Sequence, residues 1–222
     1  MRHTRLLFAG SAGLIASAAG YLLLRDQTTD SDDTGEDVGR IDVARGAQTL
    51  GARAVEALSR HVGERGQGKK GTPGYHRSPF IDKVNAGLYN DAPGLIGAPW
   101  CARAARYAYE VAAQELGRPR PFPGSVGDLA SIGKWKKHLG GHKIDAPKVG
   151  AVLLLGDTHA TIIALVIDGR TVLTVEGNRL DSVAHVRRTI GPKDTIIDAE
   201  AYASSAGGSV VGSLDLLGAV WA

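Results

Sequence analysis

Along the chain, helix-like residue patterns come first and strand-like patterns follow, and this order limits the possible folds. Helix-like spacing of apolar residues is found at Ile41–His61, Ser78–Asn85 and Trp100–Leu116, and a further helix is expected at Val126–His138. After residue 150 the apolar residues stand instead in short β-branched and aliphatic runs, which are typical of strands. Helices followed by a mostly antiparallel sheet predict an α+β fold.

Short turn sequences separate the strand-like runs. Gly156-Asp157 and Asp168-Gly169 are typical of hairpin turns, so consecutive strands should pair antiparallel. The predicted strands are Val152–Leu155, Thr161–Ile167, Thr171–Val175, Val183–Ile190 and Leu214–Trp221.

The N-terminal region reads as an export signal. An uncharged apolar run, Leu6–Leu24, follows three basic residues and is close to the roughly 20 residues that a membrane-spanning helix needs. Basic residues before the run and acidic residues after it favour a cytoplasmic N-terminus with the remainder exported. Residues 1–25 are therefore predicted to be a signal peptide or a membrane anchor, in contact with the inner membrane if they are not removed.

Two outcomes for this segment stay open. Ala16-Ser17-Ala18 is suited to cleavage by a signal peptidase, whereas the continued apolar run Tyr21–Leu24 favours an uncleaved anchor. Residues 26–40 are acidic and nearly free of large apolar side chains, which predicts a disordered linker. The folded domain is expected at residues 41–222.

Charge and cysteine content narrow the classes of function. A net charge of +3 over 222 residues, with scattered basic residues, gives no reason to expect a nucleic-acid partner. The single cysteine, Cys101, forms no intrachain disulfide. A lone cysteine is either a small buried apolar residue or a reactive thiol, and its surroundings decide between the two.

Cys101 is predicted at the first turn of the Trp100–Leu116 helix. Unsatisfied backbone N–H groups at a helix N-terminus favour negative charge and lower the pKa of a thiol there. Because the thiolate is the reactive form, this position favours a nucleophile over a structural cysteine.

A candidate base and a candidate orienting group stand at neighbouring strand ends. His159 opens one strand just after a turn, and its ordinary pKa allows it to take and return a proton. Glu176 and Asn178 close the next strand two residues apart, so both side chains are predicted to share one face. Each of these features is common in ordinary cores and turns. Their order along the chain, cysteine, then histidine, then Glu/Asn, is what predicts nucleophilic catalysis.

Four strings resemble one known family, the CHAP domains (cysteine, histidine-dependent amidohydrolases/peptidases) among the NlpC/P60-like, papain-like enzymes. The resemblance covers about Ala54 to Trp221. The strings are Gly97-Ala98-Pro99-Trp100-Cys101-Ala102, Lys148-Val149-Gly150-Ala151-Val152-Leu153, Thr158-His159-Ala160-Thr161-Ile162-Ile163 and Val175-Glu176-Gly177-Asn178.

The resemblance implies a papain-like fold and a role for each matched residue. Cys101 is the expected nucleophile, His159 the base and Glu176 the orienting acid, while Asn178 positions the imidazole or binds the oxyanion. Trp100 is assigned to substrate binding. One departure is Ala160-Thr161 where the family usually has a glycine soon after the histidine, which narrows the expected cleft.

No metal or cofactor is expected, because the acidic calcium-binding loop of some family members is not evident before Trp100. His138 and His142 stand at a spacing used by metal sites on helices, but the glycines between them favour a loop. The resemblance and the predicted export together imply a monomeric peptidoglycan hydrolase that acts on a muramoyl–L-alanine bond or on a bond of the stem or bridge peptide. An inactive envelope-binding module and an amidase of a small molecule remain as alternatives.

Overall fold

The computed structural model describes residues 35–39, 46–68, 75–89, 99–122 and 129–207. Within them a seven-stranded antiparallel sheet has the strand order β1-β6-β5-β4-β3-β7-β2. The strands are β1 (Glu36–Asp37), β2 (Lys143–Ile144), β3 (Val152–Leu155), β4 (His159–Val166), β5 (Thr171–Arg179), β6 (Ser182–Thr189) and β7 (Thr195–Ile197). The helices are α1 (Leu50–Ser59), α2 (Pro79–Ala86), α3 (Cys101–Glu115), α4 (Ile132–Leu139) and α5 (Ala199–Gly207), with a 3-10 turn, η2, at Gly140–His142.

This architecture confirms the α+β prediction and the antiparallel hairpins. β3, β4 and β5 are joined by the predicted turns, and β3 matches the predicted strand residue for residue. Among the predicted strands that the structure describes, β5 differs most, because it continues to Arg179 although its β-branched run ends at Val175. The extension exists because its last residues still pair with β6, across an irregularity in register between Glu176 and Arg179. The elements β2, β7 and α5 were not predicted.

Helix starts follow simple capping chemistry. The Ser78 side chain accepts a hydrogen bond from Ile81 N–H, and Pro79 occupies the first turn of α2, where its missing N–H costs nothing. Thr49 and Ser131 cap α1 and α4 in the same way. At α3, in contrast, the N-cap residue Trp100 makes no side-chain cap hydrogen bond.

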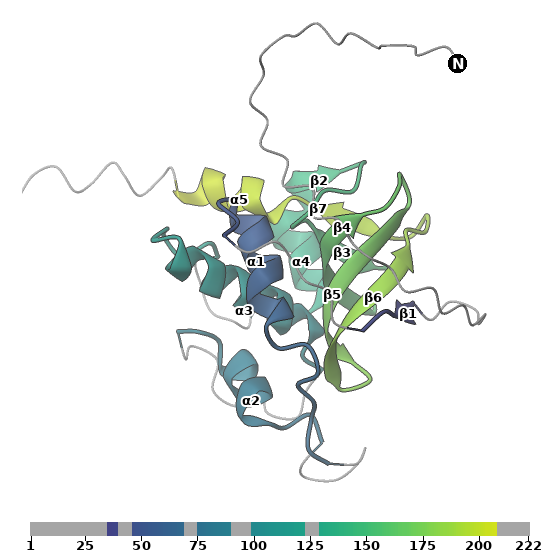
Figure 1. The fold of residues 1–222 in the computed structure, drawn as a ribbon. Helices are drawn as coiled ribbons and strands as arrows, with labels where there is room; N and C mark the ends of the chain where they lie inside the picture. The colour runs from purple at the N-terminus through teal and green to yellow at the C-terminus, as the bar shows by residue number, and fades with distance from the viewer. Residues whose placement is uncertain (1–34, 40–45, 69–74, 90–98, 123–128, 208–222) are drawn as a thin grey trace, which may run out of the picture.

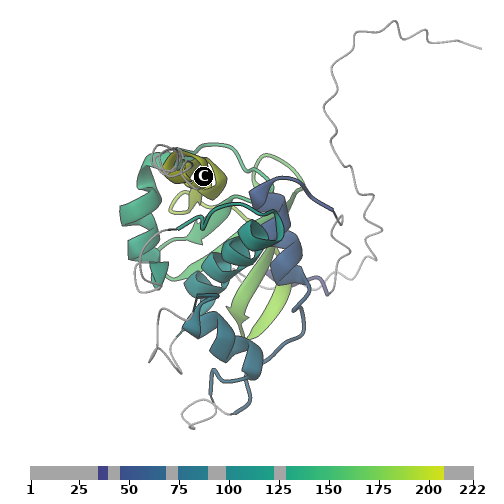
Figure 2. The ribbon, with the colours of Figure 1, turned by 90° about the vertical axis from the view of Figure 1, so that its left-hand side faces the viewer.

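The helices cover mainly one face of the sheet. Figures 1 and 2 show α1 and α3 side by side along this face, with α2 at one end of the molecule and α5 at the other. The main core lies between these layers and includes Val152, Ile162 and Val175 of the strands. A smaller apolar cluster, around Leu153, Ile163 and Val172, covers the opposite face.

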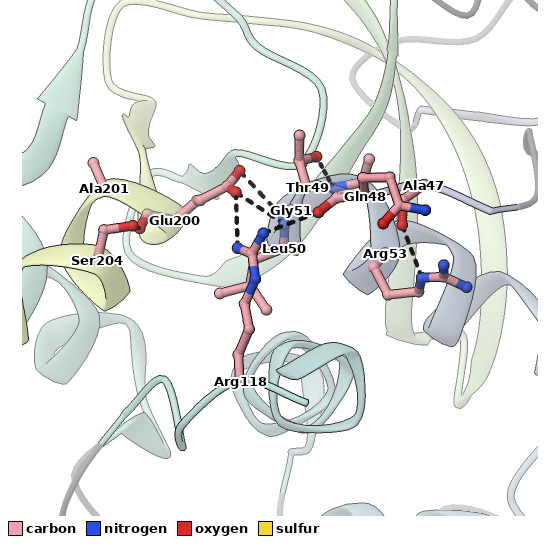
Figure 3. Close-up of polar contacts among 12 residues, drawn as sticks. Ala47, Gln48, Thr49, Leu50, Gly51, Arg53, Arg118, Glu200, Ala201 and Ser204 are labelled. Atoms are coloured by element: carbon pink, nitrogen blue, oxygen red, sulfur yellow. Dashed lines mark hydrogen bonds and ion pairs between the residues drawn. The ribbon is translucent and has the colours of Figure 1, made fainter. Parts of the chain in front are cut away.

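A carboxylate of the last described helix, α5, accepts hydrogen bonds from the first residues of helix α1. Glu200 of α5 accepts hydrogen bonds from the backbone N–H groups of Leu50, at 2.9 Å, and Gly51, at 3.5 Å (Figure 3). A negative charge at this position also suits the positive end of the helix dipole. Arg118 approaches the same carboxylate from the end of α3, at 3.5 Å. These contacts join three helices that are far apart in the sequence.

The segment just before the domain belongs partly to the sheet. Glu36 and Asp37 form the short strand β1, which pairs with Arg187 and Val186 of β6. The expectation of a disordered linker therefore does not hold at these two residues. Of the predicted linker, residues 26–34 and 40 lie outside the described residues. The same holds for the apolar run Leu6–Leu24 and for the predicted strand Leu214–Trp221. In the part of the chain that the structure describes, no helix is long and apolar enough to cross a membrane.

Candidate active site

The lone cysteine is the first residue of α3. Its side chain is mostly buried, with an exposed fraction of 7%. The backbone N–H groups of Ala102, in the same helix, and of Ala160, in β4, hydrogen-bond to the thiol. No side chain caps α3, and the N–H groups in the first turn of a helix favour negative charge nearby.

His159 joins the thiol to a buried carboxylate. It is the first residue of β4, and Nε2 of its ring lies 3.0 Å from Oε2 of Glu176. The ring also hydrogen-bonds to the Cys101 thiol. Since Nε2 is occupied by Glu176, Nδ1 is the ring nitrogen that faces the sulfur. Residues from α3, β4 and β5 therefore form a continuous Cys–His–Glu chain, as the sequence predicted.

Glu176 has further partners that sequence analysis missed. It is fully buried and accepts two hydrogen bonds from Arg188 of β6, both 2.8 Å long, from Nε to Oε1 and from Nη2 to Oε2. The Thr174 hydroxyl donates to Oε1 at 2.7 Å. Two parallel N–H···O bonds from a guanidinium hold a carboxylate in one orientation, so Arg188 fixes the oxygen that meets His159. Nothing in the sequence around Arg188 marks it, because the contact arises only from the pairing of β5 with β6.

The three ionisable groups shift one another's pKa values. Burial raises the pKa of the Cys101 thiol, but the hydrogen bond and charge of His159 and the two backbone N–H groups outweigh it, so the net shift is downward. Burial lowers the pKa of His159, and its bonds to Cys101 and Glu176 overcome this and raise it to about 9. Glu176, despite burial, has its pKa lowered to about 2 by Arg188 and His159.

These shifts favour a charged thiolate–imidazolium pair over a neutral thiol and imidazole. The thiol is a thiolate above its lowered pKa, and the imidazole is an imidazolium below about 9. In this charged pair, the proton that a base was expected to remove during the reaction is already on His159. In this state the first proton transfer available to His159 is donation to a leaving group.

Asn178 follows Glu176 by two residues in an irregular part of β5. Its backbone φ is +65°, in the left-handed region, and it stands within the irregular part of β5. Simple alternation of side chains along the strand therefore stops before Asn178. Asn178 and His159 line the same cavity, and the expected contact of the amide with the imidazole or an oxyanion stays a prediction.

Trp100 is a core residue, which corrects its assignment to substrate binding. Its side chain is fully buried and packs edge-on against Phe80, with ring centroids 6.4 Å apart. Gly177 leaves room for it, because a Cβ there would lie 2.7 Å from the indole ring. The physical reason for the correction is that the indole fills the space between α3 and the end of β5.

A second polar network, also missed by sequence analysis, holds Trp100 in place. The indole N–H donates to Oδ1 of Asp181 at 3.2 Å, and Nδ1 of His76 lies 2.5 Å from the same oxygen. Asp181 belongs to the turn between β5 and β6. Four non-glycine residues in the described part of the chain have left-handed φ angles, and all four belong to this turn or contact it: His76, Asn178, Leu180 and Asp181. Such strain persists only where surrounding contacts enforce it, and it is often found at functional sites.

The pair His138 and His142 belongs to no metal cluster. His138 is exposed at the end of α4, and the His142 ring packs edge-on against Tyr202 with centroids 5.5 Å apart. Among the described residues, no three His, Cys, Asp or Glu side chains are grouped to hold a metal ion.

Comparison with known proteins adds no relative. No protein-family model, no curated protein and no solved structure matches the chain. The fold class and the geometry of the site are therefore supported by the structure of this chain alone.

Proposed function

We propose that this chain is a cysteine amidohydrolase of the cell envelope that cleaves an amide bond in peptidoglycan. The observation that carries the proposal is the hydrogen-bonded chain from the Cys101 thiol through His159 to Glu176, with the thiol at the uncapped start of α3. A buried lone cysteine in a purely structural role needs neither an imidazole partner nor a carboxylate behind that imidazole.

Acylation begins from the thiolate–imidazolium pair. Sγ of Cys101 attacks the carbonyl carbon of the amide and forms a C–S bond, and the carbonyl electron pair moves to oxygen. The developing oxyanion is stabilised by backbone N–H groups at the start of α3. As the C–N bond breaks, His159 donates its Nδ1 proton to the departing amine, which leaves a thioester on Cys101.

Deacylation reverses the roles. Neutral His159 accepts a proton from a water molecule, whose oxygen attacks the thioester carbonyl. The C–S bond breaks, the acid product leaves, and the thiolate and imidazolium are restored. Throughout both steps Glu176 accepts a hydrogen bond from Nε2–H of His159 and takes no proton, so it fixes the ring orientation and stabilises the charge of the ring.

The finer fold and the substrate rest on the sequence resemblance. A cysteine at a helix start, packed against an antiparallel sheet with histidine at a strand start, supports a CHAP-like, papain-like domain. The predicted N-terminal signal or anchor supports a location facing the cell wall, where peptidoglycan is the abundant amide. A monomer without cofactor is sufficient for the mechanism, since all its proton transfers use residues of one chain.

The proposal is tested by identifying new chain ends in digested peptidoglycan. Purified sacculi are incubated with the protein and with Cys101→Ser, which keeps the side-chain shape but presents a hydroxyl that stays protonated. Mass spectrometry should find equal numbers of new amines and new carboxylates with the wild type only. Their positions identify the bond. Release of the same products by Cys101→Ser, or no new ends with the wild type, overturns the proposal.

A further inference from the structure

The His159 side of the site opens into a cavity that the mechanism above does not use. Its volume is about 920 Å³, and its wall includes His159 and Asn178 but not Cys101. The remaining wall comes from the turn before β4, the β5–β6 hairpin, the end of β6 and residues 193–194, with Gly35 and Glu36 of the N-terminal segment at one side.

The charged side chains of this wall are mostly cationic. Arg179, Arg187 and Lys193 line it, and the Arg179 guanidinium is held in place by a 3.1 Å bond from Nη2 to the Gly35 carbonyl. Arg187 and Lys193 are exposed. Arg188 also contributes, but its charge is matched by Glu176.

The wall also carries two carboxylates, fewer than its cationic side chains. Asp194 accepts backbone N–H bonds from Gly156, at 2.9 Å, and Gly191, at 2.8 Å, so both its oxygens are engaged by the chain. Glu36 is exposed. An imidazolium at His159 adds positive charge at the inner end of the cavity. Planar guanidinium groups are well suited to bind a carboxylate through paired N–H bonds.

The position of His159 indicates which part of a substrate would occupy the cavity. In acylation the carbonyl side stays on Cys101, and the amine departs toward the ring that protonates it. The cavity is lined by His159, the residue that protonates the leaving amine, and not by Cys101, which holds the carbonyl side.

We propose that this cavity binds a carboxylate on the leaving-amine part of the substrate, so that the enzyme prefers amides whose amine portion is an acidic peptide. This inference rests on the proposed function and narrows it. It favours bonds that release a carboxylate-bearing stem peptide over bonds that release a neutral fragment.

The test uses sacculi with free carboxylates and the same sacculi amidated with ammonia and carbodiimide. Cleavage rates are measured for the wild type, Arg179→Gln, Arg187→Gln, Lys193→Gln and the double variant Arg187→Gln/Lys193→Gln. Lys143→Gln is the matched control, because Lys143 is exposed on β2 at the opposite edge of the sheet and its change removes the same charge. Circular dichroism checks folding, and the two exposed residues provide the test if Arg179→Gln unfolds.

We expect amidation of the substrate to lower wild-type kcat/KM about 10-fold, equivalent to one lost charged hydrogen bond. The double variant should lose about the same factor on free-acid sacculi and be insensitive to amidation, while Lys143→Gln behaves as wild type. Equal rates on the two substrates, or equal effects of Lys143→Gln and the cavity variants, overturn the inference and leave the proposed function standing.

A binding arm separates the two proposals. Cys101→Ala, which cannot turn over, is sedimented with each kind of sacculi. Stronger binding to the free-acid form, lost on adding the double change but kept with Lys143→Gln, supports the cavity even if no amide is cleaved. Equal binding to both forms counts against it, whatever the cleavage experiment shows about Cys101.

Discussion

At the scale of single residues, the ionised states of the site depend on one another. Arg188 keeps Glu176 ionised, Glu176 helps to keep His159 protonated, and His159 lowers the pKa of Cys101. The negative charge on the sulfur is thus supported by Arg188, which is three contacts away and on a different strand. Substitutions along this chain should therefore change the protonation of Cys101 without touching it.

The reactivity of Cys101 should follow this coupling. The thiolate is lost as pH falls through the lowered thiol pKa, and the imidazolium is lost as pH rises through about 9. We expect kcat/KM for acylation to be bell-shaped, with its alkaline limb near 9 and its acid limb below the ordinary pKa of a thiol. The measurement is kcat/KM against pH, together with the pH dependence of iodoacetamide alkylation.

The control for this prediction is a pair of histidine variants. His159→Ala should move the alkylation pKa upward, since burial then acts without its main opposing partner. His138→Ala, at an exposed position in α4, should leave it unchanged. Identical alkylation profiles for wild type and His159→Ala contradict the assigned ion pair.

Replacing Glu176 should be more damaging than its distance from the sulfur suggests. In Glu176→Gln the NH2 group must face Arg188 in either orientation, and in one of them it also faces the Nε2 proton of His159. Arg188 also loses its counter-charge in a mostly buried site. We expect kcat to fall by about 10³- to 10⁴-fold, as when a triad histidine loses its orienting acid. Steady-state kinetics and thermal unfolding measure the two effects.

Thr174→Val is the matched control for Glu176→Gln. It removes one buried hydrogen bond to the same carboxylate but neither ion pair. It should lower the free energy of unfolding by about 1–3 kcal/mol and change kcat only slightly. If both variants reduce kcat equally, Glu176 acts through packing and not through its charge.

Some residues of the site could be predicted from local sequence, and others could not. Cys101, His159 and Glu176 were predicted because each stands at a recognisable place, a helix start, a turn exit or a strand end. Arg188, Asp181 and His76 were not, because their roles arise from pairing between strands or from a loop that contacts a distant turn. Trp100 was misassigned because its neighbour in sequence is catalytic, whereas its burial depends on Gly177 in another element.

At the scale of elements, the β5–β6 hairpin links the core to the site. Asp181, in the turn of this hairpin, accepts a hydrogen bond from the Trp100 indole N–H. Trp100 directly precedes Cys101 in the chain. Asp181→Asn keeps a side chain that tolerates the left-handed backbone but puts an amide where a carboxylate contacts His76. We expect a lower melting temperature, by about 2–12 °C for a loss of 1–3 kcal/mol, and a several-fold fall in kcat with little change in KM.

Leu180→Asn tests whether this effect belongs to the network. Leu180 is in the same turn, has a φ of +47° and is 82% exposed, so asparagine there should be neutral or slightly stabilising. Calorimetry and kinetics on both variants make the comparison. Equal losses from Leu180→Asn would assign the effect to the turn backbone, and unchanged kinetics in Asp181→Asn would remove the link to Cys101.

Element boundaries were predicted well where local chemistry sets them. Ser78-Pro79 marks the start of α2, and Gly156-Asp157 marks the turn between β3 and β4. The irregularity at the far end of β5 was not predicted, because it depends on cross-strand pairing with β6 and on left-handed backbone angles at Asn178, Leu180 and Asp181. Alternation of side chains, a local rule, fails at such an irregularity.

At the scale of the whole molecule, the N-terminal segment connects the predicted export region to the site. Composition assigned Glu36 and Asp37 to a linker, because two acidic residues carry no strand pattern of their own. Their place in the sheet comes from β6, whose free edge pairs with them. The Gly39 carbonyl accepts a hydrogen bond from Nδ1 of the fully buried His185, at 3.2 Å, and Val38 N–H donates to the His185 carbonyl at 3.1 Å.

Two truncations five residues apart should therefore differ. A chain that begins at Gly35 keeps β1 and its contacts, and should fold with the activity of the full chain. A chain that begins at Arg40 leaves the buried Nδ1 of His185 without the Gly39 carbonyl and frees Arg179 from Gly35. An unsatisfied buried donor costs about 1–3 kcal/mol, so its melting temperature should be about 2–12 °C lower.

Differential scanning calorimetry and peptidoglycan cleavage on both chains, with the full chain as reference, decide the outcome. If cavity residues Gly35 and Glu36 help to shape the leaving-amine side, the shorter chain should also discriminate less between free-acid and amidated sacculi. His185→Gln in the longer chain is the matched variant, since it alters the same hydrogen bond while keeping β1. Equal melting temperatures for the two truncated chains would place the folded unit after residue 39 and return residues 35–39 to the linker, as composition alone predicted.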